Sequence, residues 1–126
     1  MGFVADDVIY RRVSSHQIET DHATGELRPT SANFSDSTRP EPSPMSCIAH
    51  SLLNGRDPTS LVPGIGGDLL VALSVADLTA YGLTVVEDPT EDEPAHVLVI
   101  GAKTRSVRRG LAALSQWIVA PSPAGV

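Results

Sequence analysis

Short apolar runs of strand length mark the second half of the chain. Three of them, Leu69–Leu73, Leu83–Val86 and His96–Ile100, are rich in Leu and Val, which is typical of strands that are buried in a sheet. Near the N-terminus, Val8–Val13 is β-prone and alternates in part between apolar and polar residues. The pattern therefore predicts four strands.

Helix signals occur at three places. Asp57 stands before Pro58, as at the first turn of a helix. Ser74, with an acid three residues later, resembles a capping box, and Gly82 is placed to end the short helix that follows. From Arg105 to Ile118 the apolar residues are spaced four, three and four apart, which predicts a C-terminal helix with one buried stripe.

The segment 28–46 shows neither the strand period nor the helix period. It holds four prolines, five serines and two threonines, a composition typical of turns and irregular chain. We expect a long irregular loop, with Phe34 packed against the core as its anchor. Gly25 marks a turn between two short extended pieces before it. The apolar run Met45–Leu53 after it fits either a strand or a helix.

Length and composition fit one small domain. The chain has 126 residues, of which 41% are hydrophobic and only 4% aromatic, so the core consists mainly of aliphatic side chains. We expect an α/β or α+β domain over residues 1–120, with a small mixed sheet of about four strands that the C-terminal helix covers. Residues 121–126 are expected to form a flexible tail.

Charge and cysteine usage narrow the cellular context. The formal net charge is −6, with one Lys against eight Arg, which disfavours nucleic acid as a partner. No stretch approaches the roughly 18 apolar residues of a membrane span, and the N-terminus lacks the apolar core of a signal peptide. The single Cys47 excludes an internal disulfide framework. We therefore expect a cytoplasmic protein, in which the Leu69–Leu73 strand or a sheet edge could pair in a homodimer.

Basic residues crowd the predicted start of the C-terminal helix. Four of the nine Lys and Arg residues lie within 103–109, where the helix dipole disfavours cations and a bound anion would relieve the repulsion. The Gly-x-x-x-x-Gly-Lys pattern of a phosphate loop is incomplete here. Alternatively, these arginines neutralise the acidic run at 87–93. The candidate anion ligands are Arg28, beside the loop, and Lys103, Thr104, Arg105 and Arg108.

A second set of candidates follows from the order of residues along the chain. Arg12 on the first strand, then Ser31, then Glu93 or His96 resembles the order of phosphate binder, ribose contact and catalytic acid in some ADP-ribosyl-transferring and NAD-cleaving folds. That resemblance implies a small transferase that uses NAD. The alternation of the first strand places Arg12 on the same face as apolar residues, so a buried Arg12 would need a partner.

Cys47 and His96 form a third candidate site. A thiolate that a histidine activates is the arrangement of several cysteine hydrolases and acyltransferases, although a single cysteine is more often a small buried hydrophobe. The four histidines lack the His-x-x-x-His spacing of a helical zinc site. We therefore expect no metal.

Several segments together resemble a group of small bacterial proteins. The shared features are Arg11-Arg12 in the first strand, Thr30-Ser31-Ala32-Asn33-Phe34, and Pro94-Ala95-His96 before a late strand. The resemblance covers about residues 8–100. It implies that this stretch forms one domain, and it implies no activity, cofactor or partner.

The leading interpretation is a small binding or accessory module without a cofactor. It would recognise a partner protein or an anionic ligand through the 28–46 loop and the basic helix start. The alternatives are the NAD-directed transferase and, after it, the Cys-His hydrolase or acyltransferase.

Overall fold

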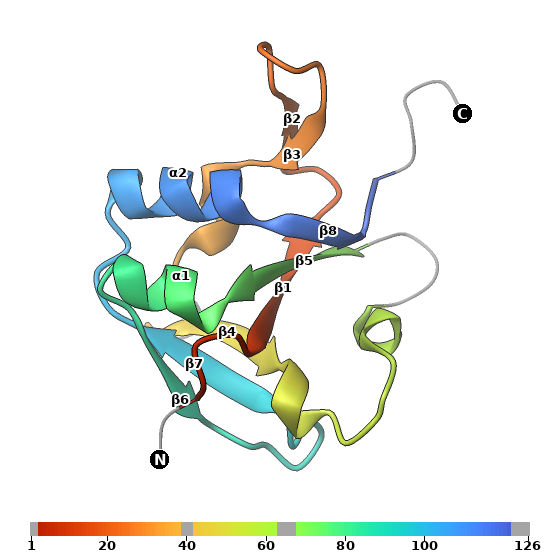
Figure 1. Cartoon of the computed structure of the whole chain (residues 1–126), viewed down its shortest axis with the longest axis vertical. Helices are drawn as coiled ribbons and strands as arrows, with labels where there is room; N and C mark the ends of the chain where they lie inside the picture. The colour runs from red at the N-terminus through yellow and green to blue at the C-terminus, as the bar shows by residue number, and fades with distance from the viewer. Residues whose placement is uncertain (1–2, 39–41, 63–67, 122–126) are drawn as a thin grey trace.

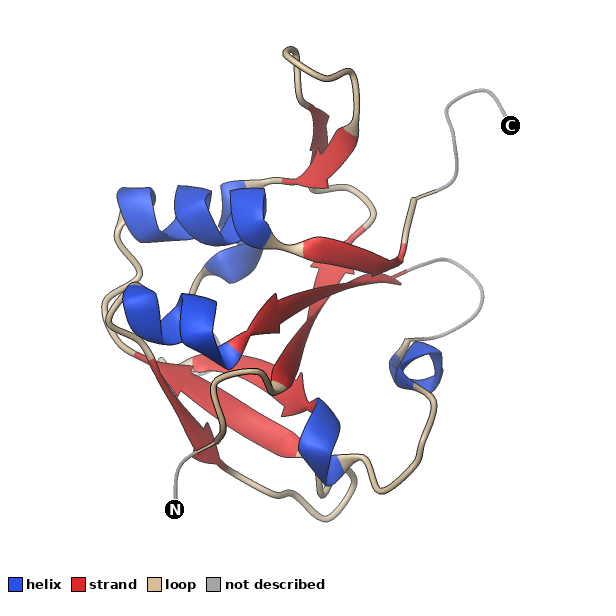
Figure 2. Cartoon of the chain, viewed as in Figure 1, coloured by secondary structure: helices blue, strands red, loops and turns tan. Residues whose placement is uncertain are grey.

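The structure is a computed structural model that describes residues 3–38, 42–62 and 68–121. A six-stranded antiparallel sheet in the order β6-β7-β4-β1-β5-β8 forms its centre (Figure 1). A separate two-stranded hairpin, β2-β3, projects from the end of β1 (Figure 2). The strands are β1 (Val8–Ser14), β2 (Ile18–Thr20), β3 (Leu27–Pro29), β4 (Met45–Ala49), β5 (Asp68–Ser74), β6 (Thr84–Glu87), β7 (His96–Ile100) and β8 (Gln116–Val119). The helices are α1 (Val75–Ala80), α2 (Arg105–Leu114) and the short 3-10 turns η1 (Ser31–Phe34), η2 (His50–Leu52) and η3 (Pro58–Leu61).

The two faces of the sheet are covered by different segments. Alternate side chains of a strand point to opposite faces, so Ile9 and Val13 pack on one face with residues of α1 and α2. We call this the helical face. Tyr10 and Leu70 lie on the opposite face, where they pack with Leu61 of η3. This second face is called the open face because neither α1 nor α2 packs on it.

The strand connections explain why each covering segment lies where it does. β4 and β5 flank β1 and both pair antiparallel with it, so they run in the same direction and the chain between them crosses over β1. Crossovers between strands of the same direction are right-handed in nearly all proteins. The β5-to-β6 and β7-to-β8 crossovers, through α1 and α2, start from strands of opposite direction and run toward opposite edges. Both crossovers can therefore lie on the helical face and have the same handedness.

The third crossover has to take the open face. The β4-to-β5 and β5-to-β6 connections start from strands that run in the same direction. The first connection runs toward the β8 edge of the sheet, whereas the second runs toward the β6 edge. If the β4-to-β5 crossover has the same handedness as the crossovers through α1 and α2, it lies on the opposite face of the sheet. Residues 50–62, which include η2 and η3, accordingly lie over the open face.

The structure confirms the four predicted strands and adds to them. The segment that fitted either a strand or a helix is strand β4, and β8 occupies the sheet edge beside β5. The expectation of a mixed sheet was wrong, since every strand pairing among the described residues is antiparallel. A sheet of about four strands was also too small.

The C-terminal helix is shorter than its apolar spacing predicts. It ends at Leu114, and the next residues turn into β8. Ile118, which the helical spacing placed on the buried stripe, is exposed. Trp117 instead pairs with Val71 of β5 and donates its indole N–H to the carbonyl of Leu27 over 3.0 Å. Pairing with a free sheet edge thus replaced the last helical turn.

The local end signals are confirmed. The Ser74 hydroxyl accepts a hydrogen bond from the backbone N–H of Asp77 over 3.1 Å, and Gly82 ends α1 with a φ of +78°, a left-handed conformation that glycine adopts without strain. Asp57 accepts from the N–H of Thr59 at the start of η3. Gly25, with a φ of +76°, sits in the turn of the β2-β3 hairpin.

The expected irregular loop is largely built into the fold. Its start belongs to β3, and η1 follows directly. Phe34 is fully buried in the helical-face core, which confirms it as the anchor. Asn33 is 5% exposed; its amide donates to the carbonyls of Gln17 and Thr30, and its oxygen accepts from Ser14 N–H. Residues 39–41 of the loop and 122–126 of the expected tail lie outside the described residues.

Two basic side chains tie this segment to the sheet. Arg11 donates to the carbonyl oxygens of Asn33 and Ser46 over 2.9 and 2.6 Å. Lys103, only 4% exposed, donates over 2.8 Å each to Asp36 Oδ1 and to the carbonyls of Val99 and Gly101. Asp36 Oδ1 also accepts from the N–H that begins β4. One ammonium therefore joins the segment before β4 to the end of β7.

None of the helices in the described part of the chain is long and apolar enough to cross a membrane.

We expect Lys103→Met to lower the free energy of unfolding by about 2–3 kcal/mol, because it removes three charge-assisted hydrogen bonds. The measurement is urea denaturation followed by circular dichroism. The matched control is Arg105→Met, since Arg105 is exposed and has no partner among the described residues. The control should change stability by less than about 0.5 kcal/mol. Equal stability of the two variants would show that the Lys103 contacts contribute little.

Candidate functional site

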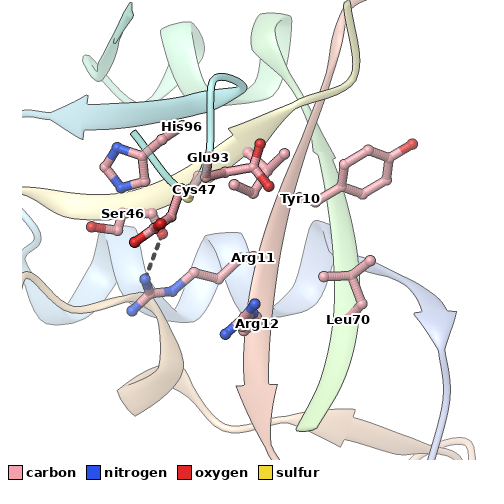
Figure 3. A pocket seen from close by; sticks show the side chains of 10 residues that line it. Tyr10, Arg11, Arg12, Ser46, Cys47, Leu70, Glu93 and His96 are labelled. Carbon is pink, nitrogen blue, oxygen red and sulfur yellow. Dashed lines mark hydrogen bonds between the residues drawn. The ribbon is translucent and has the colours of Figure 1, made fainter. Parts of the chain in front are cut away.

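A cavity of about 380 Å³ lies on the open face, over β1, β4 and β5 (Figure 3). Its walls include the apolar side chains of Ile48 and Leu70 and the ring of Tyr10. The other lining residues are Arg11 and Arg12 of β1, Ser46 and Cys47 of β4, His96 of β7, and Asp92 and Glu93 before β7. The cavity thus combines an apolar floor with a few polar groups, which is the usual composition of a small-molecule site.

Two connecting segments produce this hollow. The β4-to-β5 crossover covers Tyr10 and Leu70 from one side. The loop between β6 and β7 bends back over the start of β7, and its Ala95 is fully buried in the same open-face cluster. Among the described residues, nothing covers the sheet between these two segments, and the cavity lies there.

Arg12 is the free cation of this cavity. Arg11 also lines the cavity, but its guanidinium donates to the carbonyls of Asn33 in η1 and of Ser46. The alternation of β1 places Arg12 on the open face, opposite Leu70. Arg12 is exposed, and its guanidinium has no hydrogen bond or ion pair with any residue that the structure describes. A buried Arg12 would need a partner. Exposure removes that requirement and leaves its donors available.

Glu93 carries a neutralised negative charge at the cavity edge. Its carboxylate accepts from Arg56 through both oxygens, over 3.1 and 2.5 Å, and from the N–H of Ala95 over 3.0 Å. The hydrogen bond from Arg56 is the main reason why the pKa of Glu93 is held below its usual value. Glu93 is therefore a charged group in a fixed position.

His96 is held in one orientation. Its Nδ1 lies 2.9 Å from the carbonyl oxygen of Asp88 and 3.1 Å from the carboxylate of the same residue. A carbonyl oxygen only accepts, so Nδ1 carries the proton and donates it. In the neutral imidazole, Nε2 is then the acceptor.

Of the transferase candidates, Arg12, Glu93 and His96 line one cavity. Ser31 does not join them. It lies in η1 and lines a second hollow of about 440 Å³, together with Arg28 and Arg109. The structure therefore does not assemble the set Arg12, Ser31 and Glu93.

Ser46 stands in the main cavity instead, and sequence reasoning missed it. It pairs with Leu98 and lies two residues before Ile48, so both point to the open face. Alternation along a strand would have placed Ser46 on the same face as Ile48, but this alternation can be used only once residues 45–49 are known to form a strand.

Cys47 and His96 lie on adjacent strands, but their side chains point to opposite faces of the sheet. His96 pairs with Ile48, the neighbour of Cys47, and the Cys47 side chain packs in the helical-face core. Cys47 is 3% exposed, and burial raises the pKa of its thiol to about 11. The thiol is therefore protonated at neutral pH and has no histidine partner among the described residues.

The predicted anion ligands at the start of α2 are mostly occupied or dispersed. Lys103 uses its donors within the fold, and the Thr104 hydroxyl caps α2 by accepting from Val107 N–H over 3.2 Å. Arg105 is exposed, and the Nε of Arg108 is buried without a partner among the described residues. Arg28 forms ion pairs with two acids of the β2-β3 hairpin.

The alternative of neutralisation by the acidic run was wrong for the described residues. The ion pairs of that run join Glu93 to Arg56 and Asp88 to His96. The acidic run precedes β7 and the basic run follows it. The length of β7 therefore keeps the two runs apart.

In residues 3–38, 42–62 and 68–121, no three His, Cys, Asp or Glu side chains are grouped as metal ligands would be. Comparisons with protein-family models, with curated proteins and with solved structures find no match to this chain. The geometry of the cavity is therefore the basis for a functional proposal.

We expect native Cys47 to react with iodoacetamide at least about 100-fold more slowly than in urea-unfolded protein at about pH 8, because the buried thiol is protonated. Mass spectrometry of timed samples gives both rates. A native rate near the unfolded rate would mean that the thiol is accessible and would return the Cys-His alternative to consideration.

Glu93→Gln should destabilise the protein at neutral pH but not in acid. A carboxyl whose pKa is lowered by folding stabilises the native state above its unfolded pKa, about 4.3 for glutamate, and this contribution is lost as the pH falls through the folded value. The effect at pH 7 should be small, since Arg56 lies in solvent. The melting temperatures of wild type and variant, measured from pH 7 down through the folded pKa of Glu93, should become equal in acid. A constant difference at every pH would contradict the assignment.

Proposed function

We propose that the protein is a small binding module that takes an anionic small molecule into the open-face cavity. Arg12 is the group that contacts the anion. The observation that carries the proposal is the exposed Arg12 guanidinium, which has no partner in the described chain and stands beside an apolar floor.

The chemistry of the cavity supports this choice. A guanidinium offers paired N–H donors that match the oxygens of a phosphate or a carboxylate. The apolar side chains of Ile48 and Leu70 beside it exclude water and so strengthen the ion pair. A volume of about 380 Å³ lies at the lower end of the range of about 300–1,000 Å³ for small-molecule sites.

The overall charge of −6 does not oppose binding at this place. Arg56 compensates the charge of Glu93 through two hydrogen bonds. Arg11 also lines the cavity, but its guanidinium donates to the carbonyls of Asn33 and Ser46, so Arg12 is the lining arginine without a partner among the described residues. Surface charges farther away than about 10 Å are largely screened at physiological salt. The anion site thus moves from the start of α2, where sequence reasoning placed it, to the strand β1.

An NAD-directed transferase is the second candidate. It is favoured by the fact that Arg12, Glu93 and His96 line the same cavity. A binding role fits better because the Glu93 carboxylate already accepts from Arg56 and Ala95, whereas a catalytic acid needs an oxygen free for the substrate. Binding through Arg12 requires no cofactor.

The test uses pentyl phosphate and the variant Arg12→Gln. The phosphate ester should raise the melting temperature of the wild type, because a ligand that binds only the native state stabilises it. Arg12→Gln should weaken binding roughly 10- to 100-fold, the value of a lost charge-assisted hydrogen bond. Isothermal titration calorimetry gives the affinities.

Arg105→Gln is the matched control, since Arg105 is an exposed arginine outside the cavity. It should bind like the wild type. Loss of binding in Arg105→Gln but not in Arg12→Gln would place the anion at the start of α2, and equal loss in both variants would indicate a non-specific charge effect. No binding of phosphate or carboxylate compounds at millimolar concentration would end the small-molecule proposal. Release of nicotinamide from NAD that is lost in Glu93→Gln would favour the transferase.

A further inference from the structure

The side of the cavity opposite Arg12 offers acceptors. His96 donates through Nδ1 to the carbonyl of Asp88 over 2.9 Å, which leaves Nε2 of the neutral ring as an acceptor. The Asp88 carboxylate, 3.1 Å from the same Nδ1, supports this orientation. The neutral ring is therefore held as one tautomer, with Nε2 as its acceptor.

This acceptor is accessible. Nε2 has no hydrogen-bond partner among the described residues, and the only buried unpartnered side-chain nitrogen or oxygen found there is Arg108 Nε. His96 also lines the cavity. In Figure 3 its ring lies on the side of the cavity where Glu93 and Ser46 are drawn, and Arg12 lies on β1, which β4 separates from β7.

The other ionisable groups on this side also accept. Asp92 and Glu93 line the cavity beside His96, and an ionised carboxylate has no hydrogen to donate. The donors of Arg11, which also lines the cavity, go to the carbonyls of Asn33 and Ser46, so a ligand group beside the acceptors must donate hydrogen bonds. A hydroxyl meets this requirement, whereas a second anionic group would be repelled.

The register of the sheet sets the separation of the two ends. Tyr10 pairs with Ile48, and Ile48 pairs with His96, so these three residues form one row across β1, β4 and β7. Arg12 lies two residues beyond Tyr10. Strand spacings of about 4.8 Å and a two-residue step of about 6.7 Å give about 12 Å between the Cα atoms of Arg12 and His96. Several ligand atoms must therefore separate the anion from the hydroxyl.

We propose that the ligand is a phosphorylated or carboxylated hydroxy compound, of the sugar-phosphate or hydroxy-acid kind. Its anionic group binds Arg12 and a distal hydroxyl donates to Nε2 of His96. This inference rests on the proposed function, because it assigns the second end of the same cavity.

The test compares two ligands that differ by one hydroxyl, pentyl phosphate and 5-hydroxypentyl phosphate, by calorimetry at about pH 8, above the range in which histidines ordinarily titrate. The wild type should bind the hydroxylated compound about 5-fold more tightly, the effect of one added hydrogen bond. His96→Asn keeps a donor near the Nδ1 position and removes the Nε2 acceptor. It should bind both compounds with the affinity that the wild type shows for pentyl phosphate.

The matched variant is His96→Gln, whose longer side chain can place an amide oxygen near the Nε2 position and should keep part of the preference. If both compounds bind the wild type equally, the hydroxyl assignment is wrong and the Arg12 site stands. If neither binds, the proposed function itself fails. Loss of pentyl phosphate binding in His96→Asn would mean that the imidazole donates to the anion, which overturns the inference.

A measurement on the wild type covers the case in which His96→Asn does not fold. Long-range ¹⁵N–¹H correlation spectra of the histidine rings identify the protonated nitrogen. We expect a proton on Nδ1 of His96 and a shift of its Nε2 resonance with 5-hydroxypentyl phosphate but not with pentyl phosphate. A proton on Nε2, or the same response to both ligands, would contradict the proposal.

Discussion

The handedness of one strand crossover determines where this protein has room for a ligand. β1 lies between two strands that run in the same direction, and the chain that joins them must pass over β1 on one face. With α1 and α2 on the helical face, a right-handed crossover takes the other side. Of the residues that the structure describes, 50–62 and the β6-β7 loop cover part of that side, and the cavity lies between them.

The strand period gives the two neighbouring arginines different tasks. Arg11 donates to the carbonyl oxygens of Asn33 in η1 and of Ser46, whereas Arg12 lies on the open face and has no partner among the described residues. A similar division separates Lys103, whose donors are used inside the fold, from Arg105. Local clustering of basic residues is therefore a poor guide to an anion site, because burial decides which charges are already used.

The cavity is chemically asymmetric. On the β1 side it offers the donors of Arg12, and on the β7 side it offers the acceptors of His96, Asp92 and Glu93. The fixed tautomer of His96 and the pairing of Glu93 with Arg56 both come from the loop before β7. This loop contains most of the acidic run at 87–93, which the sequence offered as a partner for the arginines of 103–109. Two of its acids instead orient the polar wall of the cavity.

The sequence alone determined the elements whose signals are local. The strands at Val8, Leu69, Leu83 and His96, the caps at Ser74 and Asp57, and the anchoring by Phe34 all follow from side-chain period, capping chemistry or burial of one large apolar ring. Such features depend on residues within a few positions of one another, or on the hydrophobic effect alone.

Only the tertiary structure decided the rest. Whether residues 116–119 continued a helix or paired with β5 depended on a free sheet edge formed by residues far away in the chain. Strand order decided that Arg12 and His96 line one cavity, and the side of the sheet that η1 covers decided that Ser31 lies apart from both. Strand order and crossover side are long-range properties, because they arise from contacts between distant segments that no local pattern encodes.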